Sequence, residues 1–213
     1  MTHSEPLAVV QNGGVALVAA ARPAARTREV TILTADEVVR SLKGSFRLIQ
    51  READGFRAFD VSIAGFWRSF AAIVLTFPAF VALLAERRLD AGLVLREGLV
   101  FVACWIGFPL VMVGFVRLMG LERRYVGYVV AYNWSTVIAA FVLAFPAALH
   151  VFGLATPALA AFYTAAFGII VVQYRWFLAR TALCITSGLA GLVVGLDLLV
   201  NVAITWGVGA LLG

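Results

Sequence analysis

The sequence predicts an all-α membrane protein, a bundle of five transmembrane helices preceded by a cytoplasmic amphipathic helix. Hydrophobic residues make up 62% of the 213 positions and charged residues only 14%, whereas soluble domains are about 45–50% apolar and about 25% charged. The charges are clustered, so long charge-free runs lie between short basic segments. From Thr181 to Gly213, for example, Asp197 is the only charged side chain. This pattern is typical of integral membrane proteins.

Residues 1–33 show no periodic pattern, and we expect a disordered tail. A cleaved secretion signal needs a basic start and a continuous apolar core. The first ten residues contain no Lys or Arg, and the stretch Gln11-Asn12-Gly13-Gly14 interrupts the apolar run. The stretch of residues 7–25 ends in alanines and faintly resembles a secretion leader, but it lacks these two features, so we expect a tail rather than a cleaved signal.

Residues 34–60 predict a basic amphipathic helix on the cytoplasmic side of the membrane. Thr34 followed by Glu37 is a capping-box pattern that starts a helix. At about 100° per residue, the apolar residues share one arc: Ala35, Val38, Val39, Leu42, Phe46 and Ile49. The basic residues gather opposite: Arg40, Lys43, Arg47 and Arg51. Such a helix lies in the headgroup layer on anionic lipids, packs on the protein's own loops, or binds a partner protein.

The five spans form a transmembrane domain over residues 61–213. Their expected bounds are 62–85, 98–118, 126–150, 157–177 and 182–212. A membrane helix needs about 20 residues to cross about 30 Å of hydrocarbon, so each of the first four fits one crossing. The fifth is too long for one straight crossing and too short for two. We expect a single helix that tilts, bends at its glycines or continues past the headgroups.

Three prolines lie inside these apolar spans, each directly after a phenylalanine: Pro78, Pro109 and Pro146. A helix persists through proline in lipid but loses a hydrogen bond, which predicts a kink. Proline is common in membrane helices, so the kinks are either an ordinary feature of such helices or a device that shapes a cavity or gate.

Small residues in the last span recur every four positions: Ser187, Gly191 and Gly195. This spacing includes a GxxxG element and predicts a close helix–helix contact, within the chain or between copies.

Aromatic residues and a helix cap mark two further span ends. Aromatic side chains near the start of the third span predict anchors at the membrane boundary: Tyr125, Tyr128, Tyr132 and Trp134. Thr156 followed by Pro157 is typical of a helix cap with proline in the first turn, and it predicts the start of the fourth span.

The distribution of basic residues predicts the orientation. With five spans, all 17 Lys and Arg residues except Arg87, Arg88 and Arg96 fall on the side of the amino terminus. The positive-inside rule then places the amino terminus in the cytoplasm and the carboxyl terminus outside. The three arginines of the first loop depart from the rule, although acidic residues lie among them.

Asp197 and Asn201 form the candidate polar site within the membrane. An ionised Asp at mid-membrane costs about 2.5–3.5 kcal/mol, so we expect Asp197 to face the helix bundle. Asn201 follows one turn later on the same face. Arg68 and Arg175 are candidate charge partners, although both are expected near the cytoplasmic boundary. The site is either a polar contact between helices or a centre for proton or substrate coupling.

Motifs for enzyme chemistry are not found in the sequence. Cys104 and Cys184 lie in separate apolar spans and are expected to be small buried residues rather than ligands or a disulfide. We expect no catalytic residues, no metal and no cofactor, and therefore no enzyme. The net charge of +5 comes from arginines that flank the membrane, so it does not indicate nucleic-acid binding.

A cytoplasmic amphipathic segment, five spans and a cytoplasmic amino terminus resemble the Yip1-domain superfamily. More closely, "LTADEVVRSLKGSFRLIQREADGFRAFDVSIAGFWRSF", "VVQYRWFLARTAL" and a late "LD" resemble a group of small, uncharacterised inner-membrane proteins of alphaproteobacteria. This resemblance implies a helical protein of the bacterial inner membrane, and it supplies no catalytic residues.

Two functions are consistent with these observations. The first is a non-catalytic membrane scaffold or accessory protein, whose partners are anionic lipids and a second copy or another membrane protein. The alternative is a small transporter or permease component, whose proline-kinked helices line a path. A path needs several polar residues on facing helices, and polar residues are sparse in the spans. The sequence alone therefore favours the scaffold.

Overall fold

The computed structural model describes residues 33–87 and 90–212, so the tail predicted for residues 1–33 falls, apart from Leu33, outside the described residues. The helices are α1 (Ala35–Ile49), the 3-10 helix η1 (Ala53–Ala58), α2 (Ile63–Ser69), α3 (Ala72–Arg87), α4 (Ala91–Met119), α5 (Glu122–Val151), α6 (Pro157–Leu183) and α7 (Ser187–Leu212). Five stretches are long and apolar enough to span a membrane, the first made of α2 and α3 together. The prediction of an all-α protein with five spans is confirmed.

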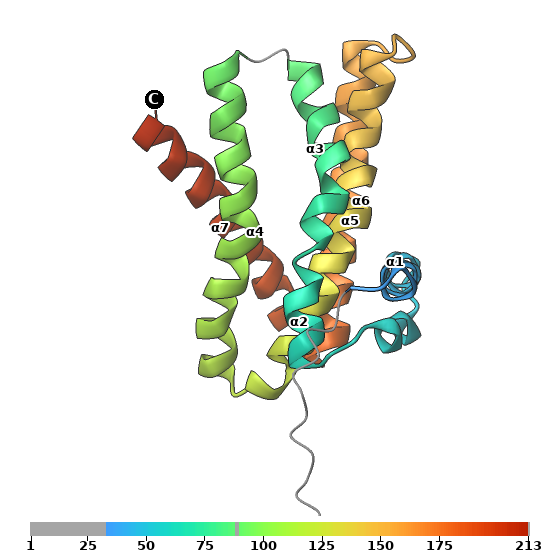
Figure 1. The fold of residues 1–213 in the computed structure, drawn as a ribbon, viewed down its shortest axis with the longest axis vertical. Helices are drawn as coiled ribbons and strands as arrows, with labels where there is room; N and C mark the ends of the chain where they lie inside the picture. The colour runs from blue at the N-terminus through green and yellow to red at the C-terminus, as the bar shows by residue number, and fades with distance from the viewer. Residues whose placement is uncertain (1–32, 88–89, 213) are drawn as a thin grey trace, which may run out of the picture. The chain divides into compact units, whose positions relative to one another are not determined.

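Several helices extend beyond the expected spans. Asp90 caps α4, because its carboxylate accepts a hydrogen bond from the backbone N–H of Leu93 at 2.9 Å. Thr156 caps α6 in the same way, with proline in the first turn as expected. The last span is one helix, and Figure 1 shows α7 crossing α4 obliquely. Residues 182–186, however, belong to the end of α6 and the turn that follows it.

The spanning helices form two groups. α3, α5 and α6 pack together, α4 pairs with α7, and α6 also contacts α7 (Figure 1). The connections α4–α5 and α6–α7 lie at the same end as α2, whereas the end of α3, the start of α4 and the connection α5–α6 lie at the opposite end. α5 is the central helix, and it contacts α1, α2, α3, α4 and α6.

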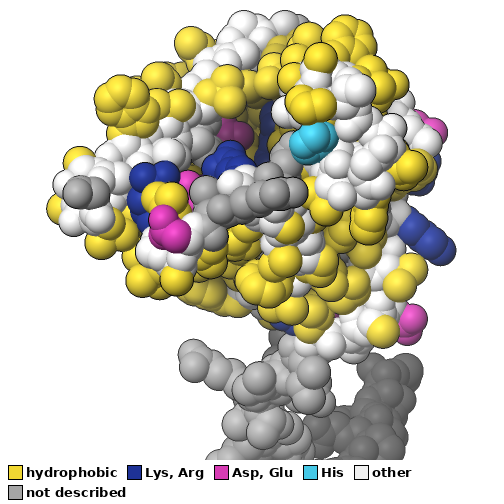
Figure 2. Space-filling view, turned by 90° about the horizontal axis from the view of Figure 1, so that it is seen from above, with side chains coloured by type: hydrophobic (Ala, Val, Ile, Leu, Met, Phe, Trp, Pro, Cys, Tyr) yellow, Lys and Arg dark blue, Asp and Glu magenta, His cyan; other side chains and the backbone are white. Residues whose placement is uncertain are grey.

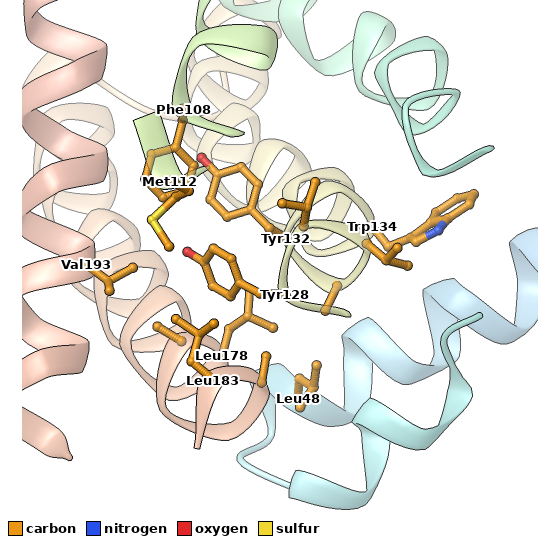
Figure 3. Packing of buried hydrophobic residues seen from close by; sticks show 14 of the residues in the cluster. Leu48, Phe108, Met112, Tyr128, Tyr132, Trp134, Leu178, Leu183 and Val193 are labelled. Carbon is orange, nitrogen blue, oxygen red and sulfur yellow. The ribbon is translucent and has the colours of Figure 1, made fainter. Parts of the chain in front are cut away.

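The central position of α5 overturns the expectation of aromatic anchors. Tyr128, Tyr132 and Trp134 are buried in the core, and Tyr125 is half-buried. Tyr128 and Tyr132 point towards α4, where the Tyr132 ring lies 4.6 Å from the ring of Phe108 (Figure 3). These residues pack between helices because other helices surround the part of α5 that carries them.

The three prolines lie inside helices that continue through them. Pro109 and Pro146 are buried, whereas Pro78 is exposed. The hydroxyl of Tyr125 donates a hydrogen bond to the carbonyl of Pro109 at 3.0 Å. A kink at each proline remains a prediction.

Two of the three residues in the small-residue stripe of α7, Gly191 and Gly195, make no close helix contact within the described part of the chain. A Cβ added at Gly191 or Gly195 would meet nothing within 4 Å there. α7 instead approaches α4 closely at Gly107, where a Cβ would lie 2.6 Å from Cδ1 of Ile204. A contact between copies through the stripe remains a prediction.

α1 begins as predicted, but it packs through a face that the pattern did not indicate. Thr34 caps the helix by accepting a hydrogen bond from the N–H of Glu37. The buried residues are Glu37, Ser41, Gly44, Ser45 and Leu48, which lie between the apolar and basic arcs. Gly44 allows the helix to approach η1, since a Cβ there would lie 2.7 Å from both Ala58 Cβ and the carbonyl oxygen of Gly55.

Much of the apolar arc of α1 remains exposed. Val39 is 50% exposed and Phe46 is 54% exposed, even though the helix is docked on α5 and α6. The helix therefore has three faces: one against the bundle, one apolar and open, and one basic. Self-packing and a lipid-facing role are thus compatible in one helix.

Candidate functional site in an intramembrane cavity

A cavity of about 470 Å³ lies between the pair α4/α7 and the group α3/α5/α6. Its polar lining includes Tyr132, Thr136, Arg175, Asp197, Asn201 and Thr205. The lining also reaches Glu97, near the end of α4 that connects to α3. Figure 2 looks onto that end and shows a hollow in which charged side chains lie among hydrophobic ones.

Asp197 faces the bundle and is only 8% exposed. Its Oδ1 accepts a hydrogen bond from the hydroxyl of Tyr132 on α5 at 2.8 Å. The side-chain amide of Asn201 donates to the same Oδ1 at 3.0 Å and to the backbone carbonyl of Asp197 at 2.8 Å. The carboxylate is therefore held in place by one neighbouring helix and by its own helix.

Arg175 lies on the other side of the Tyr132 ring. Its guanidinium carbon is 3.9 Å from the ring centroid, a distance at which cation–π attraction operates. Its Nη2 donates to the hydroxyl of Thr136 at 2.9 Å. Its Nη1 is buried and has no hydrogen-bond partner among the described residues. No carboxylate of the described residues forms an ion pair with Arg175 within 4.0 Å.

A second buried donor without a described partner lines the same cavity. Trp105 is 7% exposed, and its indole Nε1 has no hydrogen-bond partner in the ranges described. It continues an aromatic wall in which Phe80 and Phe101 stack with centroids 4.5 Å apart. Buried donors are usually paired, and an acceptor inside the cavity would pair this one.

Two of the three arginines that depart from the positive-inside rule form ion pairs at the mouth of the cavity. Glu97 pairs with Arg96 at 3.0 Å and with Arg87 at 3.6 Å. These pairs also explain why hydropathy placed the start of the second span too late. The charges that ended the apolar window belong to the helix α4 and offset one another.

Arg68 does not approach Asp197 as an ion-pair partner, although the sequence made it a candidate. It pairs with Glu37 of α1 at 2.8 Å and with Asp60 at 2.5 Å. Burial alone would raise the pKa of Asp60, but hydrogen bonds from Ser62 and the charge of Arg68 outweigh it, so the pKa lies below its ordinary value. Arg68 thus fixes α1 to the bundle.

Three of the four basic residues lie on α1, whereas Arg51 follows the end of that helix with a left-handed φ of 64°. Arg40 donates to the carbonyl of Ala58, Arg47 pairs with Glu52, and Arg51 donates to Gln173 of α6. Lys43 is exposed. All four side chains remain accessible, so their proposed contact with anionic lipid is compatible with this packing.

The two cysteines differ in their surroundings. Cys104 is partly buried and lines the cavity. Cys184 is exposed and forms the left-handed cap of α6 with φ 50°, so the expectation that it would be buried was wrong. The reason is that the turn after α6 lies within the run that hydropathy assigned to the last span.

Sequence reasoning identified Asp197 and Asn201 but missed Trp105 and Thr136 and assigned Tyr132 to the boundary. The available signal was the four-residue spacing from Tyr132 to Thr136, which places both on one face of α5. Within the described ranges, no group of three or more His, Cys, Asp and Glu residues could hold a metal ion. The arrangement can bind charged and hydrogen-bonding groups.

No family model matches the chain, and no curated protein or solved structure matches it.

Proposed function

We propose that this protein binds a small polar solute inside the membrane and acts as a small transporter or permease component. The observation that carries the proposal is the cavity whose inner end holds Asp197, Tyr132 and Arg175. Ionisable groups within membrane spans are costly, and they usually face a cavity or a functional path. The fold gathers polar residues of separate spans at one place, and this supports the transporter that the sequence alone made the alternative.

The size of the cavity supports the same proposal. Small-molecule sites commonly enclose about 300–1,000 Å³, and this cavity encloses about 470 Å³. Its wall combines aromatic rings with a few polar groups, as is usual where a ligand must be both bound and oriented.

We propose that the protein lies in a bacterial inner membrane with its amino terminus in the cytoplasm. Most arginines then lie at the cytoplasmic end, and the exposed apolar face of α1 enters the headgroup layer beside anionic lipids. The cavity would open outwards. A reporter that works only in the periplasm is expected to be active after Gly213 and inactive within residues 117–124, and the reverse pattern would overturn this orientation.

The test of the cavity measures the rate at which Cys104, a native cysteine in the cavity lining, is chemically modified. Cys184→Ser leaves Cys104 as the only thiol, because the chain has two cysteines. Small membrane-impermeant methanethiosulfonate reagents are expected to modify Cys104 from one side of a sealed vesicle. The control is Leu199→Cys with both native cysteines replaced by serine, since Leu199 is 68% exposed on α7 and faces away from the bundle.

We expect Cys104 to react at least about ten times faster than the cysteine at position 199, where surrounding lipid disfavours the thiolate that reacts. If Cys104 reacts only after denaturation, the cavity is closed to water and the proposed function fails.

A scaffold is the second candidate, and the open small-residue stripe of α7 favours it. Gly191 is exposed and Gly195 is partly exposed, so this face could pack on a second copy or another membrane protein. The Yip1-like relationship also remains a proposal. If the scaffold is correct, the original protein assembles in mild detergent, and replacement of Gly191 and Gly195 by leucine should abolish that assembly. If it is not, the original protein and the variant should both be monodisperse and of the same size.

A further inference from the structure

We propose that the solute is a small zwitterion of the apolar amino-acid type. Its carboxylate would accept hydrogen bonds from Arg175 and Trp105, and its ammonium group would lie against Asp197. This inference rests on the proposed function, and it adds the chemical class of the solute.

The donors without described partners define the place of the carboxylate. Arg175 Nη1 and Trp105 Nε1 are both buried at the cavity and lack a hydrogen-bond partner among the described residues. Phe108, one turn from Trp105 on α4, touches the ring of Tyr132, over which Arg175 lies. Both donors therefore line one cavity, and they belong to helices on opposite sides of it. Arg binds carboxylates well because its fork geometry presents parallel N–H groups.

The free acceptor defines the place of the ammonium group. Both side-chain hydrogen bonds to Asp197 end on Oδ1. Oδ2 has no hydrogen-bond donor among the residues described, and Asp197 lines the cavity. Tyr132 and Asn201 hold the carboxylate while one of its oxygens remains available to a ligand cation.

Tyr132 keeps the two protein charges apart. Arg175 lies over the face of the ring, whereas the hydroxyl at its edge donates to Asp197. A direct ion pair would neutralise both groups and leave nothing to bind. Two opposite charges separated by a ring instead match a ligand that carries both charges. Such a ligand has no net charge, so it gives each buried ion a partner without adding charge to the cavity.

The aromatic wall defines the remainder of the solute. Phe80, Phe101 and Trp105 present apolar surface to the cavity. A side chain packed there gains from burial in proportion to its apolar area. Apolar amino acids combine this side chain with the two required charges.

The experiment measures how solutes protect Cys104 from modification in the Cys184→Ser protein. The probes are alanine, valine, L-leucine and phenylalanine, together with two analogues of leucine. One analogue, 4-methylpentanoate, lacks the amine, and the other, 3-methylbutylamine, lacks the carboxylate. At least one amino acid should protect, and for leucine each analogue should need about 10-fold or more higher concentration, because each leaves one charged group unpaired.

Variants assign each charge to its residue. Arg175→Gln should weaken protection by leucine about 10- to 100-fold and leave 3-methylbutylamine unchanged. Asp197→Asn should weaken protection by leucine to a similar degree and leave protection by 4-methylpentanoate unchanged. Arg180→Gln is the control, because Arg180 is exposed on α6, the helix that carries Arg175. This variant should change protection by none of the probes.

Each outcome is decisive. If Cys104 is reactive but no amino acid protects it, the zwitterion proposal fails while the open cavity stands. Equal protection by 4-methylpentanoate and leucine would also overturn it, because the amine would then contribute nothing. The comparison of leucine with its two analogues uses a protein in which Arg175 and Asp197 are intact. It therefore does not depend on whether the Arg175 and Asp197 variants fold.

Discussion

Two arginines on spanning helices have opposite surroundings in this protein. Arg68 pairs with Glu37 and Asp60, both within 2.8 Å, and its side chain is 13% exposed. Arg175 has no ion pair with a carboxylate of the described residues within 4.0 Å, and it rests on Tyr132 and Thr136. The first site is complete without a ligand, whereas the second retains an unpaired donor.

In the proposed function, this difference separates a structural charge from a ligand-binding charge in one membrane protein. Charges that hold helices together are matched within the chain, because an unmatched charge in a low-dielectric region costs several kcal/mol. A charge that binds a ligand must tolerate incomplete pairing without it, and in the proposed function the ring of Tyr132 supplies part of the missing stabilisation of Arg175.

The sharpest test of this comparison replaces each arginine by glutamine. Arg68→Gln leaves Glu37 buried and unpaired, and we expect a loss of about 3 kcal/mol in stability. Arg175→Gln removes a cation that no carboxylate matches, so the loss should be about 1 kcal/mol or less. Thermal unfolding in detergent measures both, and equal losses would contradict the division between closed and open sites.

A second test concerns the acid of the open site. Asp197→Leu leaves the hydroxyl of Tyr132 and the amide of Asn201 without their acceptor, at about 1–3 kcal/mol, and should lower the yield of folded protein. Asp197→Asn keeps an acceptor oxygen and should cost less than about 1 kcal/mol. The measurement is the monodisperse fraction after extraction. A leucine variant as stable as the original would show that the polar contact has no structural role.

The third test disturbs the closed site through its geometry. Gly44→Ala would push α1 away from η1 and so loosen the contact of Glu37 with Arg68, at about 1–3 kcal/mol. Gly114→Ala is the matched control, since a Cβ in that helix meets nothing within 4 Å of described structure and alanine favours helix. Unfolding midpoints compare the two, and a Gly44→Ala protein as stable as the control would contradict the close fit.

The smallest expected effect is a pH dependence of the closed site. Because the pKa of Asp60 is lowered in the folded protein, its contribution to stability is complete above its ordinary pKa of about 3.9 and is lost as the pH falls through the folded value. The original protein should therefore exceed Asp60→Asn in unfolding midpoint at pH 7, and the difference should shrink towards pH 3. A constant difference would show that the charge of Asp60 is not involved.

The five spans could be predicted because hydropathy is a local property of each segment. Asp197 could be singled out for the same reason, since one charge in a long apolar run is costly wherever the other helices lie. The start of α1 was also local, because Thr34 and Glu37 are three residues apart.

The contacts between helices could not be predicted from these local signals. Arg175 was expected near the boundary because the predicted fourth span ended at residue 177, yet α6 continues to Leu183. Tyr132 was taken as an anchor, since nothing in the sequence shows which helices surround it. The buried face of α1 was missed because Glu37, Ser41 and Gly44 are small or polar and look like a solvent-facing surface.

The hydrogen bond from Arg175 to Thr136 has a consequence for biosynthesis. The α6 span has the lowest mean hydropathy of the five, and it carries this arginine. A short connection joins α5 to α6, and the two helices pack along each other. We therefore expect α6 to enter the bilayer poorly by itself and to insert as a hairpin with α5, whose Thr136 and Tyr132 receive the arginine during synthesis. Chains that end after α6 should then integrate α6 well when α5 is present and poorly when α5 is deleted.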